Sequence, residues 1–273
     1  MQQLSKILLK YLPEYLFNLL VKYILFAGVA LYLVTPPAFS KEAASAKPQV
    51  APKILVVGDS ISAEYGLKRG TGWVTLLENR LAESVNWNEK SKTKSKTVKN
   101  TTNNVAPQST NTPATAKNGT KKSAIVTVIN ASISGDTTSG GRSRLAPLLD
   151  LHHPTHVIIE LGANDALRGL PMAMTEENLN AMTQTALKSG AKVLLLGMQI
   201  PPNYGADYTK QFSAAFGKVA KANKVGLVPF MLKGVADSPD YIKLFQADRI
   251  HPTEAAQPRM LANIWPELQK QLK

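Results

Sequence analysis

Cysteine is missing from the 273-residue chain. Disulfide bonds, thiolate nucleophiles and cysteine-ligated zinc are therefore excluded. Acidic residues are scarce: 19 aspartates and glutamates stand against 32 lysines and arginines, which gives a net charge of +13. Aromatic residues make up only 7% of the chain, but a hydrophobic content of 44% is ample for a large core. The length suits one large domain or two small ones.

The excess of positive charge is concentrated in one segment. Residues 88–123 hold eight lysines and one acidic residue, a net +7, and residues 1–40 hold a net +2. The rest of the chain therefore carries only +4 of the total of +13. Because the domain itself is only weakly basic, we expect no specific nucleic-acid partner.

The first forty residues have the pattern of an export signal. Three lysines precede an eleven-residue apolar run at 24–34, and small residues follow it as a cleavage site. Eleven residues are too few to span a membrane, which takes about 20, but the stretch 15–34 reaches that length if two polar residues are tolerated. We therefore expect a cleaved signal peptide or a retained membrane anchor at 1–40, then a tether at 41–52. Either arrangement predicts a periplasmic or otherwise exported protein.

From residue 53 onward, short β-branched runs alternate with amphipathic stretches. This alternation predicts an α/β domain over 53–273, in which a parallel sheet is covered by helices on both faces. In such a sheet the chemistry lies beyond the carboxyl ends of the strands. The predicted strands are 53–57, 124–130, 156–161, 192–199 and 225–230, and the predicted helices lie near 72–84, 138–150, 175–189, 207–223 and 253–272.

One segment, residues 86–122, interrupts the alternation. It consists mainly of lysine, threonine, asparagine and serine and has almost no apolar residues. Such a composition cannot bury enough surface to offset the entropy of ordering, so we predict a disordered insertion between the first helix and the second strand. Two interpretations remain: a solvated insertion without its own activity, or an electrostatic contact with anionic lipid headgroups or another polyanion.

Chemically useful residues follow the predicted strands. Ser60 comes directly after the first strand, Gly135 follows the second and Asn164 follows the third. Near the C-terminus, Asp248 precedes His251 by three residues, a spacing that can bring both to one side of the chain. These residues supply the nucleophile, base, orienting carboxylate and oxyanion donors that acyl transfer needs.

Four blocks, in this order along the chain, resemble the SGNH (GDSL-type) hydrolase superfamily. The blocks are GDSISAEYG (58–66), NASISGDTTSGG (130–141), LGANDALRG (161–169) and DRIHPTEAAQ (248–257). The likeness continues through 197–220 and is closest to the branch of bacterial periplasmic acyl-CoA thioesterases, lysophospholipases and arylesterases. It covers about residues 53–270. The leucine usual in the family is Ile61 here, a conservative change at a packing position.

The resemblance implies a flavodoxin-like three-layer fold with a five-stranded parallel sheet of order 2-1-3-4-5. It implies that Ser60 is the nucleophile, that His251 is the general base and that Asp248 orients the imidazole. The backbone N–H groups of Ser60 and Gly135 and the side-chain amide of Asn164 would form the oxyanion hole. The expected protein is a monomeric serine hydrolase that cleaves acyl esters or thioesters without a metal or other cofactor.

Other roles remain open for single residues, and two other functions remain open for the protein. Without the other three blocks, Ser60 would be interpreted as the N-cap of a following helix, a common role of serine. Asp59 and Asp165 are expected to be structural hydrogen-bonding groups. The histidines of LHHPTH (151–156) suggest a metal cluster, but Pro154 breaks any helical register. The functional alternatives are a polysaccharide O-deacetylase of the same superfamily, and a polyanion-binding module with a vestigial triad.

Overall fold

The computed structural model describes residues 51–83 and 126–273. The predicted leader at 1–40, nearly all of the tether and the predicted insertion at 86–122 lie outside the described residues. The described residues all belong to one compact unit, Val50–Lys273.

Five parallel strands form a single sheet in the order β2-β1-β3-β4-β5, which confirms the order implied by the resemblance. The central strand β3 is fully buried and its neighbour β1 is nearly so, whereas β2 is partly exposed because it lies at the edge. The strands are β1 (Lys53–Gly58), β2 (Thr127–Asn130), β3 (His156–Glu160), β4 (Lys192–Leu196) and β5 (Gly226–Val228).

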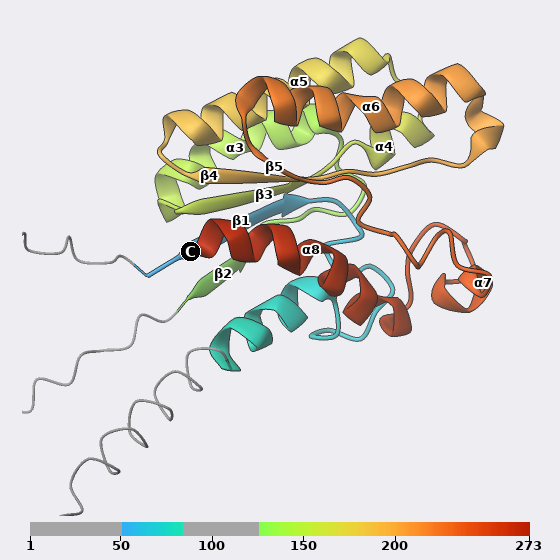
Figure 1. Cartoon of the computed structure of the whole chain (residues 1–273), viewed down its shortest axis with the longest axis horizontal. Coiled ribbons are helices and arrows are strands. Elements are labelled where there is room, and N and C mark those ends of the chain that lie inside the picture. Colours follow the sequence, from blue (N-terminus) through green and yellow to red (C-terminus); the bar gives the residue numbers. More distant parts are fainter. Residues whose placement is uncertain (1–50, 84–125) are drawn as a thin grey trace, which may run out of the picture. The chain divides into compact units, whose positions relative to one another are not determined.

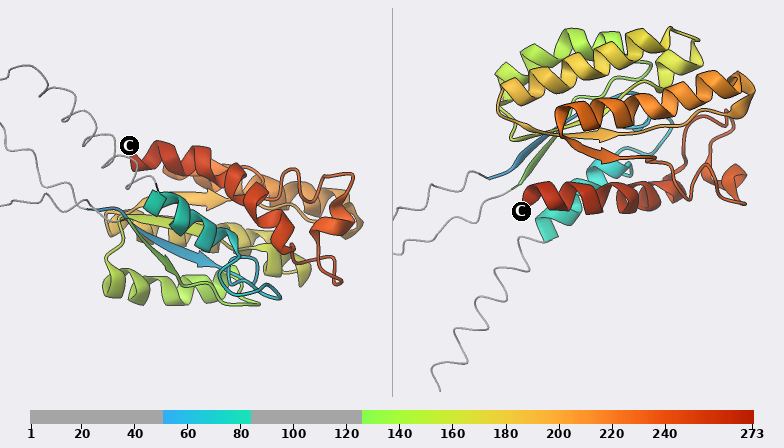
Figure 2. Two further views of the ribbon diagram at one scale, coloured as in Figure 1. Left: turned by 90° about the horizontal axis from the view of Figure 1, so that it is seen from below. Right: turned by 45° about the horizontal axis from the view of Figure 1, so that its top comes forward.

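Helices cover both faces of the sheet, as Figures 1 and 2 show. One face carries α3 (Thr138–His152), α5 (Met172–Lys188) and α6 (Ala206–Asn223), and the other carries the helical residues 73–83 and α8 (Gln257–Leu272). Their apolar faces meet the buried strands in one core. The three-layer α/β/α prediction is therefore confirmed. Among the described residues, no helix combines the length and apolar character needed to cross a membrane.

Four short helical elements were not predicted from the periodicity of the sequence. They have three to five residues each, too few for one full amphipathic repeat. One of them divides the helix predicted at 253–272 into a short turn and α8. The elements are α4 (Ala163–Leu167), η1 (Pro202–Tyr204), α7 (Tyr241–Leu244) and η2 (Glu254–Ala256).

The loops that leave the carboxyl ends of the strands lie together at one edge of the sheet. In Figure 1 the strand arrows point toward this edge, where α7 is also found. Because all five strands are parallel, the segments after β1, β2 and β3 and the long connection after β5 reach the same edge. Every residue of the predicted site follows one of these strands in the sequence, so the fold brings all of them to this edge.

Candidate active site

Ser60 lies in a tight turn, directly after β1. Residues 60–66 form turns, and the next helical residue is Trp73, so Ser60 caps no helix. Its side chain is nearly buried, with 8% of the residue exposed. The Oγ atom of Ser60 is 2.8 Å from Nε2 of His251. The structure thus rules out the capping role and pairs Ser60 with the predicted base.

A closed loop presents Asp248 and His251 together. An antiparallel bridge between Phe245 and Pro252 closes the loop at its base. One oxygen of Asp248, Oδ1, accepts the backbone N–H groups of Ile250 and His251 at 2.9 and 3.0 Å. The other, Oδ2, is 2.7 Å from Nδ1 of His251. The loop therefore holds the carboxylate and the imidazole in one fixed arrangement.

The hydrogen bonds of Asp248 determine its charge and the tautomer of His251. Burial raises the pKa of Asp248, but the bonds from the His251 side chain and from two backbone N–H groups more than offset this and lower it to about 2. Asp248 is therefore a carboxylate that only accepts hydrogen bonds, and Nδ1 of His251 must carry the hydrogen. In neutral His251, Nε2 is then free to accept the proton of Ser60.

Side chains connect the loop of the base to the turn of the nucleophile. Nε2 of Gln246 donates to the carbonyl oxygen of Tyr65 at 2.9 Å, and the rings of Tyr65 and His251 are 4.4 Å apart. The N–H of Lys68 donates to Oε1 of Glu254 at 3.0 Å. These contacts keep two segments that are about 190 residues apart in the chain in register across the site.

The three predicted oxyanion donors also gather at this edge. Gly135 has a φ of +78°, a left-handed conformation that glycine adopts without strain. Among the described residues, the backbone N–H groups of Ser60 and Gly135 have no acceptor. Nδ2 of Asn164 lies 3.1 Å from Oδ2 of Asp59 and 2.9 Å from the carbonyl oxygen of Asp136. Asn164 thus bonds to Asp59, which precedes Ser60, and to Asp136, which follows Gly135, so it lies close to both backbone donors.

Arg144 of α3 was not singled out from the sequence, yet it holds the loops around the site. Its guanidinium pairs with Oδ2 of Asp136 at 2.7 Å and donates to the carbonyl oxygens of Gly58 and Ala131. It therefore joins the end of β1 to the loop that carries the oxyanion glycine. No sequence signal marks this role, because the three acceptors converge only in the folded chain.

The two aspartates expected to be structural differ in their surroundings. Asp165 is fully buried and accepts the N–H and the hydroxyl of Thr138, at 2.8 and 2.5 Å, which confirms the structural role. Asp59 lies beside a second buried carboxyl group, Glu160, the last residue of β3. Glu160 was also missed from the sequence; its only signal is a single acidic residue that ends the apolar run HVIIE.

The histidine-rich segment lies away from the site. His156 begins β3, at the opposite end of that strand from the site, and its Nδ1 is 2.8 Å from Oγ1 of Thr155. Its Nε2 is 3.1 Å from the carbonyl oxygen of Gln271. Over 51–83 and 126–273, no three acidic or histidine side chains are grouped as metal ligands would be.

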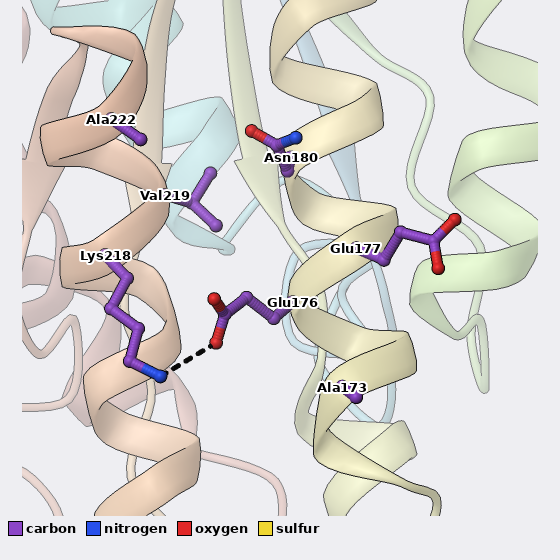
Figure 3. A pocket seen from close by; sticks show the side chains of 7 residues that line it. All are labelled: Ala173, Glu176, Glu177, Asn180, Lys218, Val219 and Ala222. Carbon is purple, nitrogen blue, oxygen red and sulfur yellow. Dashed lines mark hydrogen bonds and ion pairs between the residues drawn. The ribbon is translucent and has the colours of Figure 1, made fainter.

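Two of the hollows on the surface of the described residues differ in their position relative to the site. One, of about 490 Å³, lies between α5 and α6, where Glu176 and Lys218 form an ion pair (Figure 3). It contains none of the predicted site residues. The other, of about 360 Å³, adjoins the turn that follows Ser60 and is lined by Ala63, Glu64, Leu67, Arg69, Asn130 and Ser132.

Comparison with known families and sequences gives a consistent result. The model of the GDSL-like lipase/acylhydrolase family matches residues 112–258. The esterase TesA of Pseudomonas aeruginosa is 44% identical over 218 residues, which are 80% of this chain and 88% of TesA. An arylesterase of Vibrio mimicus is 36% identical over 84% of this chain and 94% of its own length. Thioesterase 1/protease 1/lysophospholipase L1 of Escherichia coli K12 is 34% identical over 76% of this chain and 79% of its own.

Solved structures show the same likeness in three dimensions. The crystal structure of TesA covers 81% of this chain and 99% of its own, with a TM-score of 0.63 at 44% identity. The psychrotrophic esterase EstA from Pseudoalteromonas sp., in a structure inhibited by monoethylphosphonate, covers 81% of this chain and 98% of its own, with a TM-score of 0.62 at 32% identity.

Proposed function

The chain belongs to the GDSL-like lipase/acylhydrolase family, and from that premise we propose that it hydrolyses acyl esters and thioesters through an acyl-serine intermediate on Ser60. One observation carries the proposal: hydrogen bonds of 2.7 and 2.8 Å join Asp248 to His251 and His251 to Ser60. This is the arrangement of nucleophile, base and orienting carboxylate that serine hydrolases share.

In the acylation step, Oγ of Ser60 attacks the carbonyl carbon of the substrate while Nε2 of His251 takes the hydroxyl proton. The carbonyl oxygen becomes an oxyanion, which the N–H groups of Ser60 and Gly135 stabilise. The amide of Asn164 joins them when one of its two N–H bonds turns from Asp59 or Asp136 toward the oxyanion. When the tetrahedral intermediate collapses, the bond to the leaving oxygen or sulfur breaks. His251 returns its proton to that leaving atom, and the acyl group stays on Ser60.

In the deacylation step, His251 takes a proton from water, and the resulting hydroxide attacks the acyl carbon. The second tetrahedral intermediate releases the carboxylic acid, and the proton on His251 returns to Oγ of Ser60. Throughout, the carboxylate of Asp248 balances the charge of the imidazolium. Because its pKa is lowered to about 2, Asp248 keeps this charge over the whole neutral range.

The assembled triad argues against the binding-module alternative, since a vestigial site has no need for three aligned groups. The similar proteins are named as esterases and a thioesterase/lysophospholipase, which favours ester and thioester substrates over acetylated polysaccharides. The deciding experiment compares a chain-length series of acyl-CoA and p-nitrophenyl esters with an acetylated polysaccharide. Release of acetate from the polysaccharide alone would overturn the proposed substrate class.

Replacing Asn164 with alanine should lower kcat by about 10²- to 10³-fold, because the transition state loses a neutral oxyanion donor. The matched control is Asn180→Ala in the groove between α5 and α6, an asparagine whose partner is Asn223 and which should leave kcat unchanged. Steady-state kinetics on a p-nitrophenyl ester separate the parameters. A rise in KM with unchanged kcat would make Asn164 a substrate-binding group instead.

We further propose that the protein acts outside the cytoplasm, on the pattern of its first forty residues, and that the lysine-rich segment contacts anionic surfaces. Both segments lie outside the described residues. Replacing residues 88–121 with a short Gly/Ser linker should leave hydrolysis of p-nitrophenyl butyrate within about threefold, because the cost of loop closure changes slowly with length. Co-sedimentation with anionic vesicles should fall and lose its dependence on salt. A collapse of turnover in a folded variant would show that the segment serves the acyl site.

A further inference from the structure

Glu160 is an unusual residue to find at the centre of the sheet. It ends β3, is completely buried, and pairs in register with Gly58 of β1. A Cβ atom at Gly58 would lie 2.7 Å from Oε2 of Glu160 and 2.8 Å from Cβ of Ser62. Glycine at this position therefore makes the room that the buried carboxyl group occupies, two residues before the nucleophile.

The two oxygens of Glu160 have different surroundings. Oε2 accepts the hydroxyl of Ser62 at 2.7 Å and the N–H of Asp59 at 3.2 Å. The hydroxyl of Ser62 is itself oriented, because it accepts Nε1–H of the buried Trp73 at 3.1 Å. Oε1 is buried and receives no donor within the described part of the chain. An ionised glutamate would leave this oxygen without compensation, whereas a protonated one carries its hydrogen there.

Asp59 shows the opposite pattern. Its Oδ1 accepts the N–H of Ile61 at 3.0 Å, and its Oδ2 accepts Nδ2–H of Asn164 at 3.1 Å. The N–H of Asp59 donates to Oε2 of Glu160 at 3.2 Å, so the two buried carboxyl groups belong to residues in direct contact. Two buried carboxylates this near would repel each other, and one shared proton removes that repulsion. Both oxygens of Asp59 and Oε2 of Glu160 accept hydrogen bonds, whereas Oε1 of Glu160 faces no donor among the described residues, so Oε1 is the oxygen best placed to carry the proton.

The electrostatics of the pair agree with this assignment. Burial, together with the charge of Asp59, raises the pKa of Glu160 well above its usual range. Burial also raises the pKa of Asp59, to about 6, although the bond from Ile61 and the nearby His251 oppose the rise. Of the two groups, Glu160 thus holds its proton more strongly, as expected when two carboxyl groups share a site.

We propose that Asp59 and Glu160 share a single proton, which resides on Glu160, and that neutral Glu160 positions the Asp59 carboxylate and, through it, the amide of Asn164. The inference rests on the proposed function, because Asn164 matters as an oxyanion donor and Ser60 is the residue next to Asp59. Glu160 and Asp59 are positioning residues. Neither needs to touch the substrate.

The test compares two substitutions, Glu160→Gln and Asp59→Asn, each of which replaces a carboxyl group with an amide. Glu160→Gln keeps an acceptor for Ser62 and a donor toward Asp59, so it imitates the neutral acid. Asp59→Asn turns an acceptor into a donor that faces either Ile61 or Asn164, so it should lower kcat by about 10- to 100-fold with little change in KM. Glu160→Ala removes both bonds, and we expect Glu160→Gln to rescue most of the kcat that Glu160→Ala loses.

Glu176→Gln is the matched control for the chemical change. Glu176 lies in the groove of Figure 3, where its ion pair with Lys218 is exposed and remote from the site. This variant should keep the kcat and KM of the unchanged protein. If Glu160→Gln loses as much kcat as Asp59→Asn, the proton is not on Glu160 and the proposal is wrong. The comparison needs only these two variants, so it survives if Glu160→Ala does not fold.

A second measurement requires no turnover. Infrared spectroscopy at mildly alkaline pH should show the C=O stretching band of a buried carboxylic acid in the unchanged protein and in Ser60→Ala. The band should disappear in Glu160→Gln. Its persistence in Glu160→Gln would overturn the assignment of the proton. Because the band is read without substrate, a failure here is distinguishable from a failure of Ser60 to act as the nucleophile.

Discussion

Replacing Ser60 with alanine should lower hydrolysis of p-nitrophenyl butyrate by about 10⁴- to 10⁶-fold. The reason is chemical: without Oγ there is no atom to form the acyl intermediate, and only the oxyanion donors and substrate binding remain to assist water. The fold should survive, because within the described part of the chain the Ser60 side chain bonds to His251 alone and the exchange removes one hydroxyl. We expect the free energy of unfolding to change by no more than about 1 kcal/mol.

Covalent labelling separates the loss of the nucleophile from a loss of structure. A fluorophosphonate should add one phosphonyl group to the unchanged protein and none to Ser60→Ala, as read by intact mass. The matched control is Ser213→Ala in α6, where the hydroxyl donates to the carbonyl oxygen of Lys210. This variant should keep both turnover and labelling. Full turnover by Ser60→Ala would remove the serine from the mechanism altogether.

The architecture was accessible from the sequence because its signals are local and repeated. Runs such as 53–57 and 156–161 are almost continuously apolar rather than alternating, which is typical of a parallel strand buried on both faces. The strand order was a different matter. It came from the resemblance, since periodicity alone cannot tell which strand neighbours β1. Short elements such as α4 and α7 were missed because four or five residues do not establish a helical period.

The residues of the triad were accessible for another reason: each lies in a block whose residue types are set by the reaction. Arg144 and Glu160 were not accessible, since their roles depend on contacts between segments that are far apart in the sequence. Arg144 reaches the ends of two strands from α3, and Glu160 reaches across from β3 to the turn that holds Ser62. Only the fold shows that both support the loops around Ser60.

Replacing Asp248 with asparagine should lower kcat by about 10³- to 10⁴-fold and leave KM nearly unchanged. Both oxygens of Asp248 accept N–H donors, from the backbone on one side and from Nδ1 of His251 on the other. An asparagine can satisfy only one side as an acceptor. If its carbonyl oxygen stays with the backbone, its NH₂ group faces Nδ1. His251 must then accept at Nδ1 and carry its hydrogen on Nε2, the atom that should take the proton of Ser60.

Asp240→Asn is the control that isolates this effect, because Asp240 lies on an exposed neighbouring turn and its carboxylate pairs with Lys243. Its kcat should stay within about twofold, as for most exposed substitutions of this kind. Asp248→Asn should also react more slowly with the fluorophosphonate, although Ser60 is present, because the serine is no longer activated. A variant with normal labelling but slow turnover would place the role of Asp248 after acylation. Equal kcat for both aspartate variants would mean that the backbone of the loop alone orients His251, and that the carboxylate is dispensable.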